Sequence, residues 1–356
     1  MTYLDNIRRV VPYTPGEQPV VSDIIKLNTN ENPYPPAPGV FKALKEWDAT
    51  DFRKYPEPNI ASLRQTLADY HGVTKEQVFV GVGSDDVLAM SFMTFFNSDK
   101  AVVFPDITYS FYDVWCDLLK IPYKQLPLDG EFRIKSADYV NDVCYGGVVI
   151  PNPNAPTGVA EPVSFFEDII KAHPECVVII DEAYVDFGAN TCLPLVEKYP
   201  NVVVVRTFSK SRSLAGSRIG YAIGSAELIK FLHDVKFSYN SYTLDNLTMA
   251  MGIESVKDDD YFKATVEKVV KTREWTKGEL SRLGFSFPDS KTNFIFASPS
   301  PDCGKTAGQI FDYLKEKKIF VRYWNSERIK NNLRISIGTD DEMKKLISVL
   351  EEYLCR

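Results

Sequence analysis

The sequence predicts an α/β fold with a mostly parallel β-sheet between layers of helices. Short apolar runs rich in valine and isoleucine recur through the middle of the chain, and each is followed by a polar turn and a helix-like stretch. Continuous apolar strands that alternate with helices indicate a parallel sheet that is covered on both faces. The 356 residues, of which 44% are hydrophobic, suffice for a large core and two domains.

The predicted strands come after an irregular loop at residues 28–39, which is polar and then rich in proline. They occupy residues 78–80, 101–104, 148–150, 177–180 and 202–205. Polar clusters follow these strands, and ligands of such sheets bind at the carboxyl ends of the strands. We therefore expect a binding site at this edge of the sheet.

The pattern changes near residue 255. A long charged helix, expected at residues 261–283, precedes separated strand-like runs at residues 293–297 and 333–337. These elements indicate a smaller α+β domain. The expected division of the chain is an N-terminal segment that joins the small domain, a large domain and a small C-terminal domain, at residues 1–27, 28–254 and 255–356.

Composition excludes several classes of function. The net charge of −7 argues against a nucleic-acid partner, which usually requires a basic surface. No apolar stretch approaches the roughly 18 residues that cross a bilayer, and the start resembles no signal peptide. The six cysteines form no CxxC pair, so we expect reduced thiols and a cytoplasmic location. The three histidines lie far apart without metal-binding spacing, so we expect no metal site.

Three polar clusters carry the chemistry. The glycine turn at residues 81–86 precedes a helix, whose free N–H groups suit a phosphate, although a plain helix cap at Ser84 or Asp85 explains the turn equally well. Asp181 ends a buried strand and needs a partner, such as a pyridinium nitrogen or the N–H groups of a turn.

The third cluster contains Lys210 and Arg218. A lysine at the mouth of a buried strand can act as a nucleophilic amine, and an arginine can bind a phosphate through two hydrogen bonds. Taken singly, each is explained as well by a surface charge. Together with Asp181 and the glycine turn, they indicate a site for pyridoxal phosphate (PLP), with Lys210 as the lysine that holds it as a Schiff base.

Several motifs, in this order and spacing, resemble the fold-type I PLP-dependent aminotransferases and, among them, the histidinol-phosphate aminotransferase family. The motifs are LNTNENPY (27–34), RKYPEP (53–58), GVGSDD (81–86), PDITYSFY (105–112), NPNAPTG (152–158), DEAYVDF (181–187), TFSKSRSLAGSRIGY (207–221) and NLRISIG (332–338). The resemblance covers nearly the whole chain. It implies a large domain with a mostly parallel seven-stranded sheet between helices, and a smaller α+β domain.

The resemblance also implies a role for each matching residue. Lys210 would carry the proton between the substrate Cα and the cofactor C4′, Asp181 would pair with the pyridine nitrogen, and Tyr184 would contact the ring oxygen. Tyr109 would stack on the ring. The cofactor phosphate would be held by the backbone amides of Ser84 and Asp85, by Ser209 and Arg218, and by Tyr55 from the partner subunit of a homodimer. The substrate's anionic group would be bound by Arg322 and Arg334, with help from Tyr13.

One position departs from the family motif. An asparagine that bonds the ring oxygen usually stands directly before Pro-Thr-Gly, where this chain has Ala155. Asn154, one residue earlier, is the candidate replacement, and Tyr184 would otherwise bear more of that contact.

The implied reaction transfers an amino group from a small-molecule donor to a keto acid, most closely histidinol phosphate and 2-oxoglutarate. An aromatic amino-acid aminotransferase would use the same residues, and a threonine-phosphate decarboxylase, a lyase, shares the scaffold. A nicotinamide-dependent oxidoreductase would need a GxGxxG turn after its first strand, which we do not find. A non-enzymatic binding module would leave the lysine, aspartate and arginine without a purpose.

Overall fold

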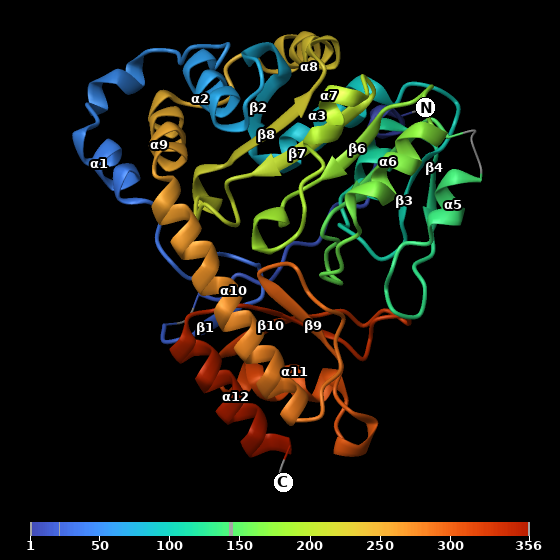
Figure 1. Cartoon of the computed structure of the whole chain (residues 1–356), viewed down its shortest axis with the longest axis vertical. Coiled ribbons are helices and arrows are strands. Elements are labelled where there is room, and N and C mark those ends of the chain that lie inside the picture. The colour runs from blue at the N-terminus through green and yellow to red at the C-terminus, as the bar shows by residue number, and fades with distance from the viewer. Residues whose placement is uncertain (1, 21, 142–144, 355–356) are drawn as a thin grey trace.

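Two β-sheets organise the structure, and each has its own hydrophobic core (Figure 1). The computed structural model describes residues 2–20, 22–141 and 145–354. The larger sheet and most of the helices form the upper body in Figure 1, and the smaller sheet lies below it. Within the described residues, no helix is both long and apolar enough to cross a bilayer.

The larger sheet has seven strands in the order β2-β8-β7-β6-β5-β3-β4. Strand β8 runs antiparallel to both of its neighbours, whereas all the other pairings are parallel, which confirms the prediction of a mostly parallel α/β sheet. The strands are β2 (Val78–Val82), β3 (Val102–Pro105), β4 (Tyr123–Leu126), β5 (Gly147–Pro151), β6 (Val178–Asp181), β7 (Val202–Thr207) and β8 (Ile219–Gly224).

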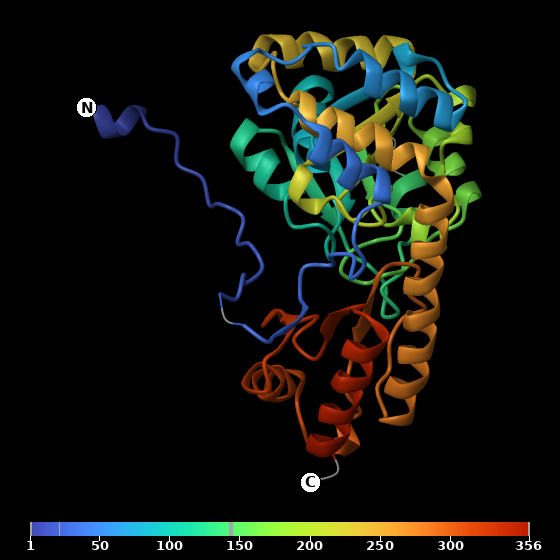
Figure 2. The same cartoon turned by 90° about the vertical axis from the view of Figure 1, so that its left-hand side faces the viewer.

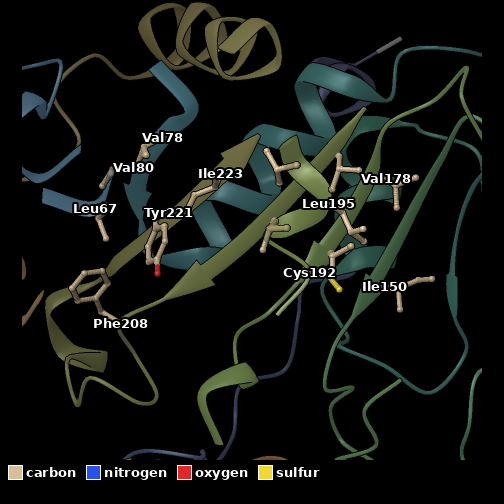
Figure 3. Close-up of a cluster of buried hydrophobic side chains, with 14 of the residues drawn as sticks. Leu67, Val78, Val80, Ile150, Val178, Cys192, Leu195, Phe208, Tyr221 and Ile223 are labelled. Carbon is tan, nitrogen blue, oxygen red and sulfur yellow. The ribbon is translucent and has the colours of Figure 1, made fainter. Parts of the chain in front are cut away.

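Alternate side chains of these strands enter two different cores, because successive residues of a strand point to opposite faces. Val78 and Ile150 belong to one cluster (Figure 3). Helices α2, α6, α7 and α9 contribute side chains to the same cluster. Phe79 and Val149 belong to the other cluster, under helices α3, α4 and α8. The helices of this body are α1 (Pro38–Glu46), α2 (Ala61–His71), α3 (Gly83–Phe95), α4 (Tyr112–Leu119), α5 (Ser136–Val140), α6 (Val163–Ala172), α7 (Pro194–Lys198), α8 (Ala226–Tyr239) and α9 (Asn246–Lys257).

The smaller sheet has the strand order β1-β10-β11-β9. Its strands are β1 (Ile25–Leu27), β9 (Phe294–Ala297), β10 (Ile319–Tyr323) and β11 (Leu333–Ser336). Helices α10 (Asp259–Arg282), α11 (Ala307–Glu316) and α12 (Asp340–Leu354) accompany it, and α10 descends from the upper body along its side (Figures 1 and 2). Strand β1 pairs in parallel with β10, so the N-terminal segment does add a strand to the small sheet.

Strand β8 is the main element that no apolar run predicted, and it shapes the edge of the site. Its Gly220 lies against the backbone of Gly83 and Ser84 so closely that a Cβ atom would come within 2.2 Å of it. Glycine at this position therefore lets the start of α3 approach the sheet. The loop at 28–39 also ends earlier than expected, because Pro38 begins α1, where a proline is well tolerated.

Candidate active site

The predicted site residues gather around two neighbouring cavities at the carboxyl ends of the large sheet's parallel strands. The inner cavity has a volume of about 170 Å³ and the outer one about 250 Å³. Both are lined by Thr29, Asp85, Tyr109, Ala155, Tyr184 and Lys210. A larger cleft of about 750 Å³ lies elsewhere, between the loop at 130–133 and the segment at 286–291, and none of the predicted site residues lines it.

Lys210 lies three residues beyond the end of β7 and lines both cavities. Its Nζ atom donates a hydrogen bond to the carbonyl oxygen of Thr29 at 3.1 Å. Asn32 donates to the Lys210 carbonyl at 3.2 Å and so fixes the backbone of this turn. Among the described residues, Lys210 forms no ion pair with a carboxylate, and its amine also lies 5.6 Å from the centroid of the Tyr184 ring.

Asp181 is the last residue of β6 and is buried at the base of the inner cavity. Its Oδ2 atom accepts a hydrogen bond from the Tyr112 hydroxyl at 2.9 Å, and its Oδ1 atom accepts one from the Ala183 N–H at 3.1 Å. Burial raises the pKa of Asp181 to about 6, and the two hydrogen bonds oppose that shift. No described cation pairs with this carboxylate, so the base of the cavity suits a positively charged ligand atom.

Tyr184 is held in place by contacts with the segment before α1 and with the small sheet. Its hydroxyl accepts a hydrogen bond from the side-chain amide of Asn30 at 2.9 Å, and its ring meets the ring of Phe294 edge-on at 5.1 Å. Asn30 is fixed in turn, because its Oδ1 atom accepts a hydrogen bond from Ser336 at 2.9 Å. The segment before α1 and the small sheet therefore both hold Tyr184 against the cavity.

The start of α3 and Arg218 form one end of the inner cavity, the end with features of an anion-binding site. Gly83 has φ = +84°, and the Arg218 guanidinium occupies the space that a side chain at residue 83 would fill. Arg218 donates to Ser209 at 3.3 Å and lies 3.2 Å from the Asp85 carboxylate. Because an arginine, a hydroxyl and a helix N-terminus converge here, this end of the cavity can bind an anion.

Tyr109 lines both cavities. Its hydroxyl donates to Asp85 at 2.7 Å, and burial, together with the Asp85 charge, holds its phenol pKa well above the usual value. Its ring meets Tyr112 edge-on at 5.8 Å. The ring is thus fixed at a place where it can contact a planar ligand.

Two arginines line the outer cavity from neighbouring strands. Arg322 of β10 and Arg334 of β11 stand directly opposite each other in the small sheet. Arg334 donates to the carbonyl of Asn28 at 2.8 Å, but its Nε atom is buried and finds no hydrogen-bond partner among the described residues. Burial and the nearby Arg322 charge lower the pKa of Arg334. Since like charges directly opposite are destabilising, the pair indicates an anionic ligand.

Tyr13 completes the outer cavity from the N-terminal segment. Its ring stacks on Phe111 with the centroids 4.1 Å apart. Arg322 lies 3.4 Å from the carbonyl oxygens of Thr14 and Pro15 and so holds the same segment. The structure therefore places Tyr13 in the same cavity wall as both arginines.

Two predicted residues do not line either cavity. Tyr55 is 82% exposed, and its ring lies tilted by 31° against that of Tyr242, with the centroids 4.7 Å apart. Lys236 links the two segments that carry these tyrosines, because its Nζ atom donates hydrogen bonds to the carbonyls of Pro58 and Ser241 at 2.8 and 2.9 Å. Tyr55 thus faces away from the cavities of its own chain, a placement that suits a role in a second subunit.

Asn154 is the other residue outside the cavities. Its side-chain amide donates to the Ile107 carbonyl at 2.9 Å and to Thr157 at 3.1 Å, and its Oδ1 atom accepts from Thr108 at 2.9 Å. Both amide hydrogens are therefore used within the loop, and Ala155 occupies the cavity wall instead. This placement does not favour Asn154 as a ligand of the ring oxygen.

Residue-by-residue sequence reasoning missed Tyr112 and Asn30. Both lie inside motifs that carried the resemblance, PDITYSFY and LNTNENPY. Tyr112 stands three residues after Tyr109, about one helical turn, which could have suggested that the two rings lie together. Asn30 gave no such signal, because its contact with Tyr184 joins residues 154 positions apart.

The site fits PLP on three features of the structure. The buried Asp181 carboxylate has no cationic partner among the described residues, Arg218 packs against Gly83 at the start of α3, and the Lys210 amine lines the same cavity as both. An aromatic ring with a basic nitrogen at one end and a phosphate at the other would satisfy both ends at once.

Comparison with known proteins agrees with this geometry. Residues 22–350 match the family described as aminotransferase class I and II. A histidinol-phosphate aminotransferase of Lactococcus lactis subsp. cremoris is 50% identical over 355 residues, which cover 99% of this chain and 98% of that protein.

Two solved structures are also similar. The histidinol-phosphate aminotransferase of Sinorhizobium meliloti, in complex with pyridoxal-5'-phosphate, has a TM-score of 0.82 and 26% identity, and the match covers 93% of this chain and 91% of that one. L-threonine-O-3-phosphate decarboxylase of Porphyromonas gingivalis has a TM-score of 0.76 and 20% identity, over 94% of this chain and 100% of that one. The second likeness is one of fold alone.

Proposed function

This chain belongs to the class I and II aminotransferase family, and from that premise we infer that it is a PLP-dependent histidinol-phosphate transaminase. It converts L-histidinol phosphate and 2-oxoglutarate into imidazole-acetol phosphate and L-glutamate, a step of histidine biosynthesis. The observation that carries the substrate assignment is the pair Arg322 and Arg334, which faces the cavity that contains Lys210. The 50% identity to a histidinol-phosphate aminotransferase over 99% of the chain supports it.

Bound PLP supplies a carbonyl that accepts the amino group and a ring that stabilises negative charge at the substrate Cα. We propose that the chain's own residues do the rest. The Lys210 amine would take the proton from Cα and return it at C4′, because its side chain lines both cavities. Asp181 would keep a proton on the ring nitrogen, since its buried carboxylate lacks a cationic partner.

The remaining cofactor contacts follow from the ends of the inner cavity. Arg218, Ser209 and the amides of Ser84 and Asp85 would hold the phosphate. Tyr109 would cover the ring face. Tyr184 would bond the ring oxygen alone, because Ala155 offers no polar group and the Asn154 amide is engaged elsewhere.

The outer cavity would bind the substrate. The buried Nε atom of Arg334 has no partner in the described part of the chain, and a phosphate oxygen would satisfy it. Arg322 would contribute the second positive charge, and Tyr13, stacked on Phe111, would border the imidazole. Two arginines at one site favour a dianionic phosphate over a single carboxylate.

We propose a homodimer in which Tyr55 reaches the partner subunit's cofactor phosphate. Tyr55, Phe52 and Tyr242 are exposed in the single chain, and Tyr55 and Phe52 border a surface cavity of about 420 Å³. Exposed aromatic clusters of this kind are typical of interfaces.

The division into an N-terminal segment, a large domain and a small domain, at residues 1–27, 28–254 and 255–356, remains our proposal. The pairing of β1 with β10 and the separate cores of the two sheets support it. A cytoplasmic location also remains a proposal. The four described cysteines, Cys116, Cys176, Cys192 and Cys303, are unpaired, which is consistent with a reducing compartment.

A turnover panel tests the function. The purified protein with PLP is given histidinol phosphate, phenylalanine, tyrosine or threonine phosphate, each with 2-oxoglutarate. Fastest glutamate formation with histidinol phosphate is expected. Preferred turnover of phenylalanine or tyrosine would make the enzyme an aromatic transaminase, and carbon dioxide release from threonine phosphate would make it a lyase.

A further inference from the structure

We propose that Trp324 is a positioning residue that aligns Arg322 and Arg334 for a doubly charged phosphate. The inference rests on the proposed function and adds a residue to its substrate site. Trp324 directly follows β10 and lines the outer cavity together with both arginines. The guanidinium carbon of each arginine lies 5.2 Å from the centroid of the indole ring.

The contact with two cations at once is what singles out this tryptophan. Arg322 and Arg334 are cross-strand partners, and their charges repel each other. The negative face of an aromatic ring attracts a guanidinium, most strongly for tryptophan, and also favours a fixed orientation of the guanidinium plane. One indole that contacts both groups therefore offsets their repulsion and holds them on the same cavity.

Arg334 is confined from a second direction. Its guanidinium carbon lies 5.4 Å from the ring centroid of Phe294, which is fully buried. Phe294 also contacts the Tyr184 ring. Arg334 thus lies near two aromatic rings, of which only that of Trp324 is shared with Arg322 and lines the outer cavity.

Trp324 is itself anchored across the two bodies. It packs on a small apolar cluster in which Ile107 and Leu128 come from the large body and Phe296 and Ile329 from the small one. Arg328, four residues later, donates to the Leu128 carbonyl at 2.8 Å and pairs with Asp106. The position of the indole therefore depends on the packing of the small sheet against the large domain. A change in that packing would also change the positions of Arg322 and Arg334.

This arrangement has a consequence for selectivity. A phosphate dianion can use both guanidinium groups if they are held side by side, whereas a substrate without phosphate has no group to fill both. Loss of the indole should therefore weaken binding of phosphorylated substrates more than binding of aromatic amino acids.

The test compares Trp324→Leu, Trp324→Phe and the control Trp275→Leu in the PLP-loaded full-length enzyme. Trp275 lies on α10 and is 41% exposed, so its replacement controls for the loss of an indole outside the site. The measurements are KM and kcat for histidinol phosphate and for phenylalanine, with 2-oxoglutarate, and the inhibition constant of inorganic phosphate.

Trp324→Leu is expected to raise both KM for histidinol phosphate and the inhibition constant of phosphate about tenfold, with kcat and the values for phenylalanine nearly unchanged. Trp324→Phe should recover most of the loss, and Trp275→Leu should match the wild type. Unchanged phosphate inhibition in Trp324→Leu overturns the proposal, as does an equal loss for both substrates. Failure of the wild type to use histidinol phosphate would instead overturn the proposed substrate, and the phosphate measurement would still decide the role of Trp324.

Discussion

The hydroxyl of Tyr112 donates a hydrogen bond to Oδ2 of Asp181 at 2.9 Å, and both side chains are buried. The bond stabilises the charged carboxylate and so lowers the pKa that burial raises. Replacement of Tyr112 by phenylalanine should therefore raise the pKa of Asp181 further and weaken PLP binding about tenfold. A spectroscopic titration of the cofactor-free protein with PLP measures this dissociation constant.

Tyr123→Phe is the matched control, because Tyr123 lies on β4 and is 38% exposed. It should bind PLP like the wild type. If Tyr112→Phe binds PLP with unchanged affinity, the tyrosine only fills space beside Asp181.

Asp181→Asn should have opposite effects on the cofactor-free and the loaded protein. Burial raises the pKa of Asp181 from 3.8 to about 6, so the cofactor-free fold favours the protonated acid. The stability that this acid contributes is present at low pH and is lost as the pH rises from about 4 through about 6. Asparagine carries no charge, so its contribution does not change with pH. The free energy of unfolding of the variant should therefore rise above that of the wild type between about pH 4 and pH 6, and exceed it by on the order of 3 kcal/mol at higher pH.

Thermal or denaturant unfolding of both proteins without PLP, across the same pH range, measures the difference. The other titrating groups are common to both proteins and cancel. With PLP present, the variant should lose affinity and turnover, because asparagine cannot keep the ring nitrogen charged. A stability difference that does not change with pH would show that Asp181 is not held as a raised-pKa acid.

The sheet could be read from the sequence because its buried strands are continuous apolar runs. The run at residues 148–150 falls within β5, the run at 177–180 begins one residue before β6, and the long charged helix is α10. Strand β8 was not predicted, because Gly220 and Gly224 interrupt its run of apolar residues. Gly220 is nevertheless required, because the start of α3 lies directly against its backbone.

Asp181 and Lys210, which line the inner cavity, could also be found from the sequence, since Asp181 ends an apolar strand and Lys210 lies three residues beyond another. The outer cavity was not readable from spacing. Arg322 and Arg334 become neighbours only through antiparallel pairing of β10 and β11, and their contact with Trp324 depends on packing between the two bodies. The family resemblance indicated the arginines, whereas nothing in the sequence indicated the tryptophan.

Arg334→Lys should lower kcat/KM for histidinol phosphate about a hundredfold, although it keeps the positive charge. A lysine cannot reproduce the planar set of donors, and its ammonium would face the same burial that lowers the pKa of Arg334. Steady-state kinetics measure the effect, and Arg282→Lys, at an exposed position on α10, is the control. A loss of less than about threefold would place the substrate's anionic group elsewhere.

Tyr55 and Lys210 allow a test of the homodimer, because they would serve the same site from different subunits. Lys210→Ala should lower turnover by at least about a thousandfold, since no other described lysine lines the inner cavity. Tyr55→Ala should weaken PLP binding and activity in both sites of its own dimer. A mixed dimer of the two variants, however, contains one site with Lys210 from one subunit and Tyr55 from the other.

That site is intact, so the mixed dimer should recover up to about half of the wild-type activity, whereas each parent remains impaired. Differently tagged subunits, co-expressed and purified through both tags, provide the mixed species, and a wild-type dimer with both tags is the control. If Tyr55 served its own subunit instead, one site of this mixed dimer would lack Lys210 and the other would lack Tyr55, so neither site would be intact. A mixed dimer of wild type and a Tyr55→Ala/Lys210→Ala double variant separates these cases. It would retain one wild-type site if Tyr55 acts within its own subunit, but would have one site without Lys210 and one without Tyr55 if it acts across the interface. Recovery in the first mixed dimer together with loss in the second would establish that Tyr55, which faces away from its own cavity, acts in the partner subunit.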